Sequence, residues 1–221
     1  MRKRVLLSFS GGIDSTALLL WYLKKGYSIE AVGFKYQSLH NLIELVSAEE
    51  ISKLYGSVRF TMIDVSTIFA NFSSALLKNS TVKIPKVDQS SFSSKPTIIP
   101  FRNSIFGSIL VGLAESKGID TVAMGLHRGR LGYLPDASPA FVQAFRKTVL
   151  KGSEKKMKIE TPFLLGSKTD IVKWGLKNNL PFNLTRTCYG PKQKACGLCG
   201  ACYERLEAFK NNNAEDPIIY V

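Results

Sequence analysis

A short run of small, hydroxylic and acidic residues, SGGIDST at 10–16, separates two apolar segments near the N-terminus. The apolar segment before it, 5–9, has the length of a buried strand, and the segment after it has the spacing of a helix. A strand that ends in a glycine turn and opens a helix exposes several backbone N–H groups at the positive end of the helix dipole, where phosphate oxygens bind. Gly11 and Gly12 allow the main chain to approach such an anion closely. The sequence therefore predicts a phosphate-binding loop.

The charge chemistry of this loop differs from that of the common P-loop, because no Gly-Lys-Ser/Thr follows at the right distance. Asp14 suits a Mg²⁺ ion that bridges the phosphates of a bound nucleotide. The alternative interpretation is a tight turn in which Asp14 or Ser15 only caps the helix. The predicted nucleotide-binding residues run from the end of the strand into the first helical turn: Ser8, Phe9, Ser10, Gly11, Gly12, Ile13, Asp14, Ser15 and Thr16.

All four cysteines lie near the C-terminus, as Cys188, Cys196, Cys199 and Cys202, with the spacing C-x7-C-x2-C-x2-C. Two overlapping Cys-x2-Cys units and one more distant thiolate can surround a zinc ion, and four thiolates leave no open position on it. The zinc would therefore be structural rather than catalytic. An iron–sulfur cluster is the first alternative, and disulfides or free thiols are the second.

The rest of the chain alternates short strand-like runs with amphipathic segments. This alternation predicts an α/β fold, a doubly wound and mostly parallel sheet, with a C-terminal zinc-binding lobe. Ligands of such sheets bind at the carboxyl ends of the strands, where the SGGIDST run falls. Residues 78–97, rich in Ser, Lys and Pro, predict a loop or a mobile cover. The predicted strands are 5–9, 28–34, 57–65 and 121–125, and the predicted helices are 14–24, 39–55, 67–77, 103–117, 139–150 and 168–178.

The size and charge of the chain limit its function classes. Its 221 residues predict one domain over 1–180 and the cysteine lobe over 181–221. The net charge of +13 favours an anionic partner, which we expect to be a nucleotide, a nucleic acid or an acidic protein. We expect no membrane-spanning segment, and the short apolar run after MRKR is typical of a first strand rather than a signal peptide, which predicts a cytoplasmic protein.

Several segments resemble a known family. The run FSGGIDSTALLLW resembles the pyrophosphate loop of the ATP-pyrophosphatase (PP-loop) superfamily, whose fold is adenine nucleotide alpha hydrolase-like. Together with YQSLHNLIEL, PFRNSIF, TPFLLGSKTDIVKWGL and the cysteine tail TCYGPKQKACGLCGACYERLEAF, it is similar to the 7-cyano-7-deazaguanine (preQ0) synthase family of queuosine biosynthesis. The resemblance covers nearly the full length.

This resemblance implies an ATP-dependent carbon–nitrogen ligase. ATP would adenylate the carboxylate of 7-carboxy-7-deazaguanine, ammonia would displace AMP, and a second adenylation of the resulting amide would lead to the nitrile. The resemblance also implies a homodimer. Its catalytic residues would be Asp14, Arg102 and Lys168, although Arg102 could instead cap a helix and Lys168 could be a surface residue. Its substrate-binding residues would be His40, Arg102, Asn103, His127, Tyr133 and Asp136, although His40 could be a buried structural histidine.

The segment 126–138 departs from the family pattern. His127, Arg128 and Arg130 stand where the family has Asn and Asp, and Ala137-Ser138 replaces Cys-Arg. This substitution puts the acceptor substrate in doubt more than the adenylation. A second hypothesis is therefore a paralogue that couples the activated deazaguanine carboxylate to a protein or nucleic-acid amine, in antiviral defence or DNA modification. A third hypothesis is a tRNA thiolase, which would need a redox-active cysteine near ATP. The remaining alternative is a nucleotide-binding module that catalyses no reaction.

Overall fold

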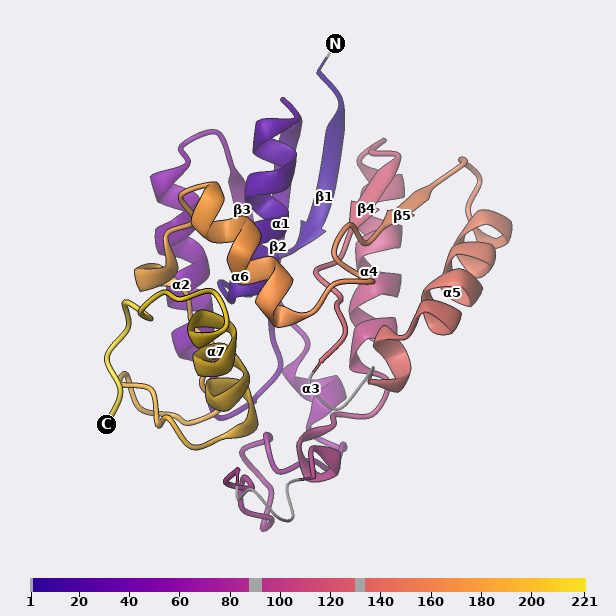
Figure 1. The fold of residues 1–221 in the computed structure, drawn as a ribbon. Helices are drawn as coiled ribbons and strands as arrows, with labels where there is room; N and C mark the ends of the chain where they lie inside the picture. Colours follow the sequence, from indigo (N-terminus) through magenta and orange to yellow (C-terminus); the bar gives the residue numbers. More distant parts are fainter. Residues whose placement is uncertain (1, 88–92, 130–133) are drawn as a thin grey trace.

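The computed structural model describes residues 2–87, 93–129 and 134–221. Its centre is one parallel sheet with the strand order β3-β2-β1-β4-β5 (Figure 1). The strands are β1 (Arg4–Ser8), β2 (Ser28–Lys35), β3 (Arg59–Asp64), β4 (Thr121–Ala123) and β5 (Lys158–Glu160). The chain builds outward from β1 first to one side and then to the other, so the predicted doubly wound α/β fold is confirmed. The order reverses between β1 and β4, which places the switch point next to the glycine loop.

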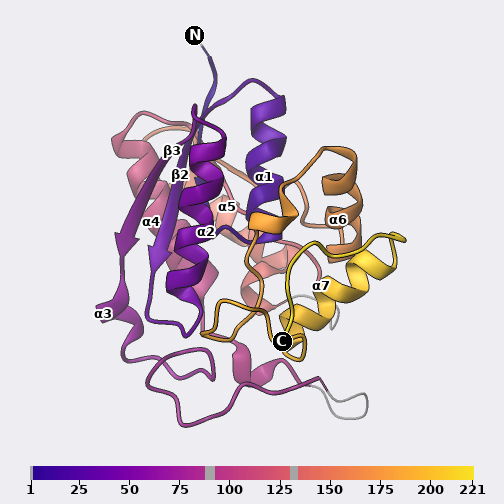
Figure 2. The ribbon, with the colours of Figure 1, turned by 90° about the vertical axis from the view of Figure 1, so that its left-hand side faces the viewer.

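Helices cover both faces of the sheet, and Figure 2 shows the strands between α4 and α1. In β1, Leu6 packs in the cluster that contains residues of α4 and α5, whereas Val5 and Leu7 pack in the cluster that contains residues of α1 and α2. Alternate side chains of a strand point to opposite faces, so a central strand with helices on both sides is apolar throughout. The longer helices are α1 (Ile13–Lys24), α2 (Asn41–Leu54), α4 (Arg102–Ser116), α5 (Pro139–Gly152), α6 (Lys168–Lys177) and α7 (Gly200–Lys210).

The predicted helix over 67–77 is wrong beyond its first turn, because α3 spans only Ser66–Phe69. The chain then forms an isolated antiparallel bridge between Leu77 and Ser38, and the Leu39 N–H donates a 2.8 Å hydrogen bond to the Leu76 carbonyl. Ala75, Leu76 and Leu77 are all buried. Main-chain hydrogen bonds to residues 37–39 therefore take the place of the helical ones over this segment.

Two elements were not expected from the sequence, the edge strand β5 and the helix α7. The strand has only three residues, too few for a visible alternation. The helix begins at Gly200, within the cysteine motif, and packs beside α6 (Figure 1). Its Ala208 and Phe209 join a buried cluster with Ile13 and Leu20 of α1. The cysteine segment is therefore packed against the helix that follows the glycine loop.

The expectation that no segment is long enough to cross a membrane needs a correction. By length and composition, residues Lys95–Ser116 are long and apolar enough to cross a membrane, and 33% of the apolar stretch within them is buried. The part of this segment that forms α4 packs on the sheet, with Leu110 and Ala114 fully buried. A helix that packs in a protein core passes the same length and composition test.

Candidate active site and metal centre

The loop between β1 and α1 packs tightly against α2. Gly11 has a φ of +76°, and a Cβ atom placed on it would lie 2.5 Å from the backbone N of Ala48 and 2.8 Å from the backbone O of Glu44. These neighbours are main-chain atoms that cannot move aside, so glycine is required here. The Gly11 carbonyl also accepts a 2.9 Å hydrogen bond from the backbone N–H of Arg186. The loop is therefore held between α2 and the C-terminal segment.

Hydroxyl groups of the loop hold its shape. The Ser15 Oγ and the Thr16 Oγ1 both donate to the Gly12 carbonyl, at 3.1 and 2.8 Å. The Ser10 and Ser15 Oγ atoms lie 3.3 Å apart, and both residues line a cavity beside the loop. Thr16 is fully buried and, like Gly11, is not part of the cavity lining. Ser10 and Ser15 are therefore the loop hydroxyls in position to reach a ligand.

Gly11→Ala is expected to weaken nucleotide binding at least about tenfold and to lower the free energy of unfolding by about 1–3 kcal/mol, because the new Cβ would overlap the backbone of α2. Calorimetric titration with ATP and urea unfolding measure the two effects. Gly112→Ala in α4 is the matched control, since a Cβ there meets no atom within 4 Å. If Gly11→Ala and Gly112→Ala have the same ATP affinity and the same free energy of unfolding, the packing of Gly11 against α2 is not needed for nucleotide binding.

Asp14, at the start of α1, forms an ion pair with Lys168, at the start of α6. The Lys168 Nζ lies 2.6 Å from each carboxylate oxygen of Asp14. A capping box fixes the start of α6: the Asp170 N–H donates to the Ser167 Oγ, and the Ser167 N–H donates to the Asp170 carboxylate at 2.8 Å. Lys168 is only 6% exposed. Local capping and a long-range ion pair thus direct one lysine ammonium to the glycine loop.

His127 is the second cationic side chain beside Asp14. Its Nε2 is 3.4 Å from the Asp14 Oδ2, and its Nδ1 is 3.0 Å from the Arg128 carbonyl oxygen. Because both ring nitrogens face oxygen acceptors, the doubly protonated ring satisfies both contacts. Burial alone would lower the pKa of His127, but the Asp14 carboxylate raises that pKa above its usual range. Burial alone would raise the pKa of Asp14, but Lys168 and His127 hold that pKa well below its usual range. One carboxylate therefore carries two cations.

ATP binding is expected to weaken roughly tenfold as the pH rises from about 6 to about 9, and to change less in His127→Gln. The reason is that the raised pKa keeps His127 cationic at low pH, and the ring loses its proton as the pH rises through that pKa. Calorimetric titrations across this range measure the effect. Arg128→Gln removes a neighbouring exposed cation and serves as the control. A wild-type pH profile equal to that of His127→Gln would contradict the assignment.

Two groups at the start of α2, the buried His40 and the half-buried Glu44, form another part of the cavity wall. The His40 Nε2 lies 3.6 Å from the Glu44 Oε2, and His40 is 2% exposed. Burial, reinforced by Arg102 and Arg186, lowers the pKa of His40 to about 3, so the ring is neutral. Burial raises the pKa of Glu44 to about 8 although the same two arginines act to lower it. Glu44 is therefore a carboxyl group that changes protonation near neutral pH.

Arg102 begins α4 and faces these groups. Its guanidinium carbon lies 5.9 Å from the ring centre of Tyr36, at the end of β2. Burial alone would lower the pKa of Arg102, but Tyr36, Tyr189 and Glu44 raise it, so the side chain remains cationic. The Tyr189 ring centre is 5.5 Å from that of His40. Arg102 is thus a half-buried cation beside aromatic rings.

Asn103 and Asp136 hold the start of α4 in place. The Asp136 carboxylate accepts hydrogen bonds from the Asn103 backbone N–H at 2.7 Å and from its side-chain amide at 3.3 Å. Phe101, which precedes the helix, has a φ of +55° and provides no side-chain cap. Asp136 therefore takes over the capping role and keeps Arg102 directed into the cavity. Tyr133, also predicted to bind substrate, lies outside the described residues.

A cavity of about 350 Å³ at the carboxyl ends of the strands joins these two walls. The described part of the loop 78–97 reaches its rim through Val87, Ser94 and Thr97. A bridge between Lys86 and Cys199 ties this loop to the C-terminal lobe. Every residue predicted for catalysis or substrate binding that the structure describes lines the cavity: Asp14, His40, Arg102, Asn103, His127, Asp136 and Lys168.

Glu44, Arg186 and Tyr189 are among the cavity residues that were not predicted. Glu44 follows His40 by four positions, a spacing that places both side chains on one helix face, so the run Tyr-x3-His-x3-Glu carried a signal for it. Arg186 and Tyr189 carried none, because they flank Cys188 in a segment whose pattern indicates only metal binding. Arg186 is 5% exposed and donates to the carbonyls of residues 190, 192 and 193, while its buried Nε has no partner among the described residues.

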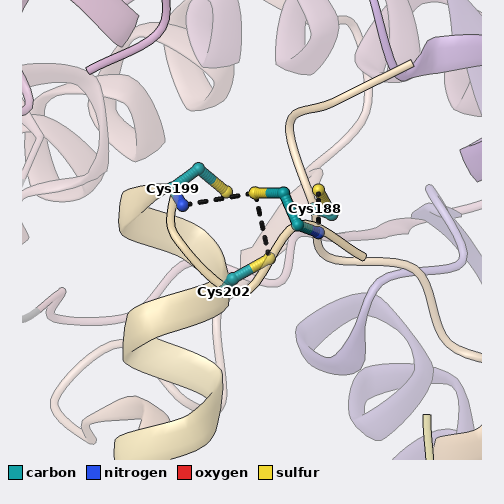
Figure 3. Close-up of side chains that lie close together, drawn as sticks. Cys188, Cys199 and Cys202 are labelled. Atoms are coloured by element: carbon teal, nitrogen blue, oxygen red, sulfur yellow. Dashed lines mark hydrogen bonds between the residues drawn. The ribbon is translucent and has the colours of Figure 1, made fainter. Parts of the chain in front are cut away.

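The four cysteines form a compact cluster. The Sγ atoms of Cys188, Cys196, Cys199 and Cys202 all lie within 4.8 Å of one another, and none of them forms a disulfide. Figure 3 shows the sulfur atoms of Cys188, Cys199 and Cys202 directed toward each other. The Cys188 Sγ accepts the backbone N–H groups of Gly190 and Cys196, at 3.2 and 3.3 Å, and the Cys196 Sγ accepts that of Cys199 at 3.3 Å. Backbone donors to sulfur favour the thiolate that a metal needs, so the cluster fits a metal ion.

Comparison with known proteins points to one family. The family sequence model described as "Queuosine biosynthesis protein QueC" matches residues 4–213. The chain is 40% identical over 220 residues to the 7-cyano-7-deazaguanine synthase of Pseudoalteromonas atlantica, covering 100% of both chains. It is 36% identical over 220 residues to the synthase of Psychromonas ingrahamii, covering 100% of this chain and 99% of that one.

Solved structures agree on the fold alone. A 4-thiouridine synthetase in complex with RNA and bound ATP has a TM-score of 0.55 at 19% identity, covering 93% of this chain and 50% of that one. The U34-tRNA thiolase NcsA of Methanococcus maripaludis has a TM-score of 0.50 at 14% identity, covering 95% of this chain and 66% of that one. Because the family match and the synthase relatives both extend over essentially the whole length, this chain belongs to the QueC family of 7-cyano-7-deazaguanine synthases.

Proposed function

We propose that this chain is an ATP-dependent ligase that converts 7-carboxy-7-deazaguanine and ammonia to the nitrile 7-cyano-7-deazaguanine, with release of AMP and pyrophosphate. The observation that carries the proposal is the glycine loop, which opens with Lys168 and His127 into the same cavity as Arg102 and Glu44. That arrangement has one wall suited to phosphate groups and a second wall suited to a polar heterocycle. Both substrates of an adenylation reaction would therefore meet in one cavity.

In the first half of the reaction the substrate carboxylate would attack the α-phosphorus of ATP, and pyrophosphate would leave. Loop amides, the Ser10 and Ser15 hydroxyls, Lys168 and His127 would stabilise the charge on the departing pyrophosphate. Ammonia would then displace AMP to form the amide. A second ATP would adenylate the amide oxygen, and loss of AMP and a proton would leave the nitrile. Arg102 would hold the substrate near the α-phosphorus, and its contribution would be positioning.

Mg²⁺ would enter with ATP as the MgATP substrate, where it neutralises phosphate charge. Asp14 is an oxygen ligand of the kind that Mg²⁺ prefers. Both of its carboxylate oxygens lie 2.6 Å from the Lys168 ammonium, so coordination by Asp14 would require Lys168 to release one of them. Lys168 would then be free to contact the phosphates.

Zinc is the metal that we propose for the cysteine cluster. Cys188, Cys196, Cys199 and Cys202 would hold it with all four positions filled, so that it would cross-link the lobe and take no part in the reaction. The solved structure of NcsA contains a [4Fe–4S] cluster, which is a property of that thiolase. Metal analysis and the visible absorbance of the purified protein distinguish zinc from an iron–sulfur cluster.

One experiment tests the proposed reaction. The purified protein is incubated with ATP, Mg²⁺, ammonium and 7-carboxy-7-deazaguanine, and the products are identified by mass spectrometry. AMP together with the nitrile supports the proposal, and absence of AMP contradicts it. AMP without the nitrile, with a deazaguanine mass added to a co-encoded protein or to a nucleic acid, would support the second candidate function. The observation that favours this second candidate is the position of His127, which pairs with Asp14 in a segment that departs from the family pattern. A homodimer and an acidic protein or nucleic-acid partner stay predictions.

A further inference from the structure

The cavity is lined by four carboxylates of the described residues, and they differ in what they contact. Asp14 is paired with Lys168 and His127, and Asp136 accepts two hydrogen bonds from Asn103. Glu204, on α7, acts on the pKa values of His127 and Tyr189, which places it near those rings. Glu44 is the fourth. Its role is unexplained by the adenylation chemistry described above.

The Glu44 carboxylate lies in the cavity wall without a hydrogen bond to any of the described residues. Its side chain is 15% exposed, and the His40 Nε2 is 3.6 Å from the Glu44 Oε2, beyond hydrogen-bond length. His40 is also neutral at the pH of the cell, because its pKa is lowered to about 3. A buried polar group without a partner costs free energy, so a partner from a ligand would stabilise the filled site.

The neighbours of Glu44 determine which partner fits. Burial raises the pKa of Glu44 to about 8, and Arg102 and Arg186 act against that shift. A ligand with two adjacent donors would therefore stabilise the ionised form, in which both oxygens accept hydrogen bonds. Tyr36, Tyr189 and the neutral His40 ring line the same cavity and provide aromatic surface there. The N–H groups of the Arg102 guanidinium can donate hydrogen bonds to a carbonyl oxygen of a ligand. The wall thus offers a double acceptor, a donor and flat apolar faces.

A 2-amino-6-oxo heterocycle has the complementary edge. Its ring N1–H and its 2-amino group are adjacent donors, and its 6-oxo group is an acceptor. An adenine ring presents an acceptor at N1 beside its 6-amino donor, so it would require a carboxyl group that donates from one oxygen. The two arginines act against that protonated form, and two donors of a ligand would stabilise the ionised form together with them. The neighbours of Glu44 therefore favour the guanine-type edge over the adenine-type edge.

We propose that the Glu44 carboxylate accepts the N1–H and 2-amino groups of the 7-deazaguanine substrate, and that Arg102 donates to its 6-oxo oxygen. This inference rests on the proposed function. Segment 126–138 has arginines where the family has Asp. Glu44, on α2, would instead be the acidic residue that recognises the N–H groups of the guanine edge. Glu44 would thus be a specificity-determining residue outside the segment that departs from the family pattern.

The test compares two ligands on the wild type and on Glu44→Gln by calorimetric titration. The ligands are 7-carboxy-7-deazaguanine and its analogue without the 2-amino group. The wild type is expected to prefer the 2-amino compound by about 100-fold, because the analogue leaves one Glu44 oxygen unpaired. Glu44→Gln is expected to lose about 30- to 100-fold in affinity for the 2-amino compound and little for the analogue, since glutamine offers one acceptor and one opposing donor. ATP affinity should stay unchanged.

Controls and contrary outcomes separate the possible failures. Glu49→Gln lies on the same helix with a side chain 56% exposed, and it should bind both ligands like the wild type. A wild type that binds neither ligand overturns the proposed function, and this inference with it. A wild type that binds both ligands equally overturns the inference alone, whether or not Glu44→Gln folds. The inference also fails if Glu44→Gln keeps full affinity for the 2-amino compound, or if it loses affinity for ATP instead.

Discussion

Lys168→Met is expected to form AMP at least about 1,000-fold more slowly than the wild type, which corresponds to about 4 kcal/mol in the activation barrier. Lys168 is the lysine whose ammonium reaches the start of α1, where the loop amides converge. A buried ammonium stabilises charge on a leaving pyrophosphate far more than an exposed one, because water screens it little. The rate of AMP release, measured by mass spectrometry at saturating ATP, tests this expectation.

The matched control is Lys173→Met on the same helix, since Lys173 is exposed and should leave AMP release within about twofold of the wild type. Thermal unfolding of both variants separates catalysis from folding. Lys168→Met leaves Asp14 with His127 as a cation, so a moderate loss of stability is expected. If a folded Lys168→Met variant released AMP at the wild-type rate, the loop would not be the pyrophosphate site proposed here.

Asp14 is a less informative residue to replace. Asp14→Ala would leave Lys168 buried without its carboxylate, and breaking a buried ion pair in this way typically costs about 3–5 kcal/mol. Loss of activity in that variant would therefore mix a catalytic defect with unfolding. Asp14→Asn keeps the shape and two hydrogen-bonding atoms, so the difference between the two variants measures how much of the Asp14 effect is structural.

The glycine loop and the longer helices could be predicted because their signals are local. The Gly-Gly turn falls where an apolar run of strand length meets a helical spacing, and the structure has β1 ending at Ser8 and α1 beginning at Ile13. Ser167 and Asp170 form a capping box, a pattern visible in the sequence. The parallel arrangement of the strands could also be predicted, because strands alternate with helices and two parallel neighbouring strands need a crossover connection, usually a helix.

The contacts that assemble the site could not be predicted, because they join residues far apart in the chain. Lys168 and Asp14 are 154 positions apart, and Arg186 reaches Gly11 through its backbone. Neither contact leaves a pattern in the intervening sequence. The family resemblance supplied Lys168 by motif, but only the folded chain shows that its partner is the aspartate that we expected to hold Mg²⁺.

The segment from 66 to 78 shows a second limit. Its apolar residues are spaced well enough for a helix, yet residues 74–78 bridge the region after β2 instead. Tertiary pairing here overrides local preference, because the main-chain groups of residues 37–39 need partners. The prediction failed where local signals were weakest and non-local hydrogen bonds were available.

The cysteine lobe is part of the cavity rather than an appendage. Arg186 and Tyr189 lie on either side of Cys188, and Gly200 and Ala201 follow Cys199; all four line the cavity. The Arg186 backbone N–H also donates to Gly11 in the loop. A structural metal that holds these residues would therefore hold the substrate wall and one side of the phosphate loop. The role of the metal can therefore be tested by measuring ligand affinity as well as the free energy of unfolding.

Cys199→Ser is expected to reduce bound zinc from one equivalent to below about a tenth, and to lower the free energy of unfolding by several kcal/mol. The basis is that structural zinc contributes on the order of 10 kcal/mol to the folding of small zinc-binding units. Cys199 occupies the N-cap position of α7, where serine is a favourable residue, so the helix start is preserved and the loss reports on the metal. Metal analysis and urea unfolding measure the two quantities.

The same variant should also bind ATP and 7-carboxy-7-deazaguanine more weakly, since Arg186 and Tyr189 would lose their fixed positions. Lys194→Ala, an exposed change in the same lobe, should retain metal, stability and binding. If metal analysis of the wild-type protein found iron and sulfide, the bound group would be an iron–sulfur cluster rather than zinc, and its structural role would be the same. Retention of both metal and stability by Cys199→Ser would show that the four sulfurs do not form a metal centre. If the metal were lost with both affinities unchanged, the lobe would be a separate stabilising unit, and the cavity would be held by α2, α4 and α6 alone.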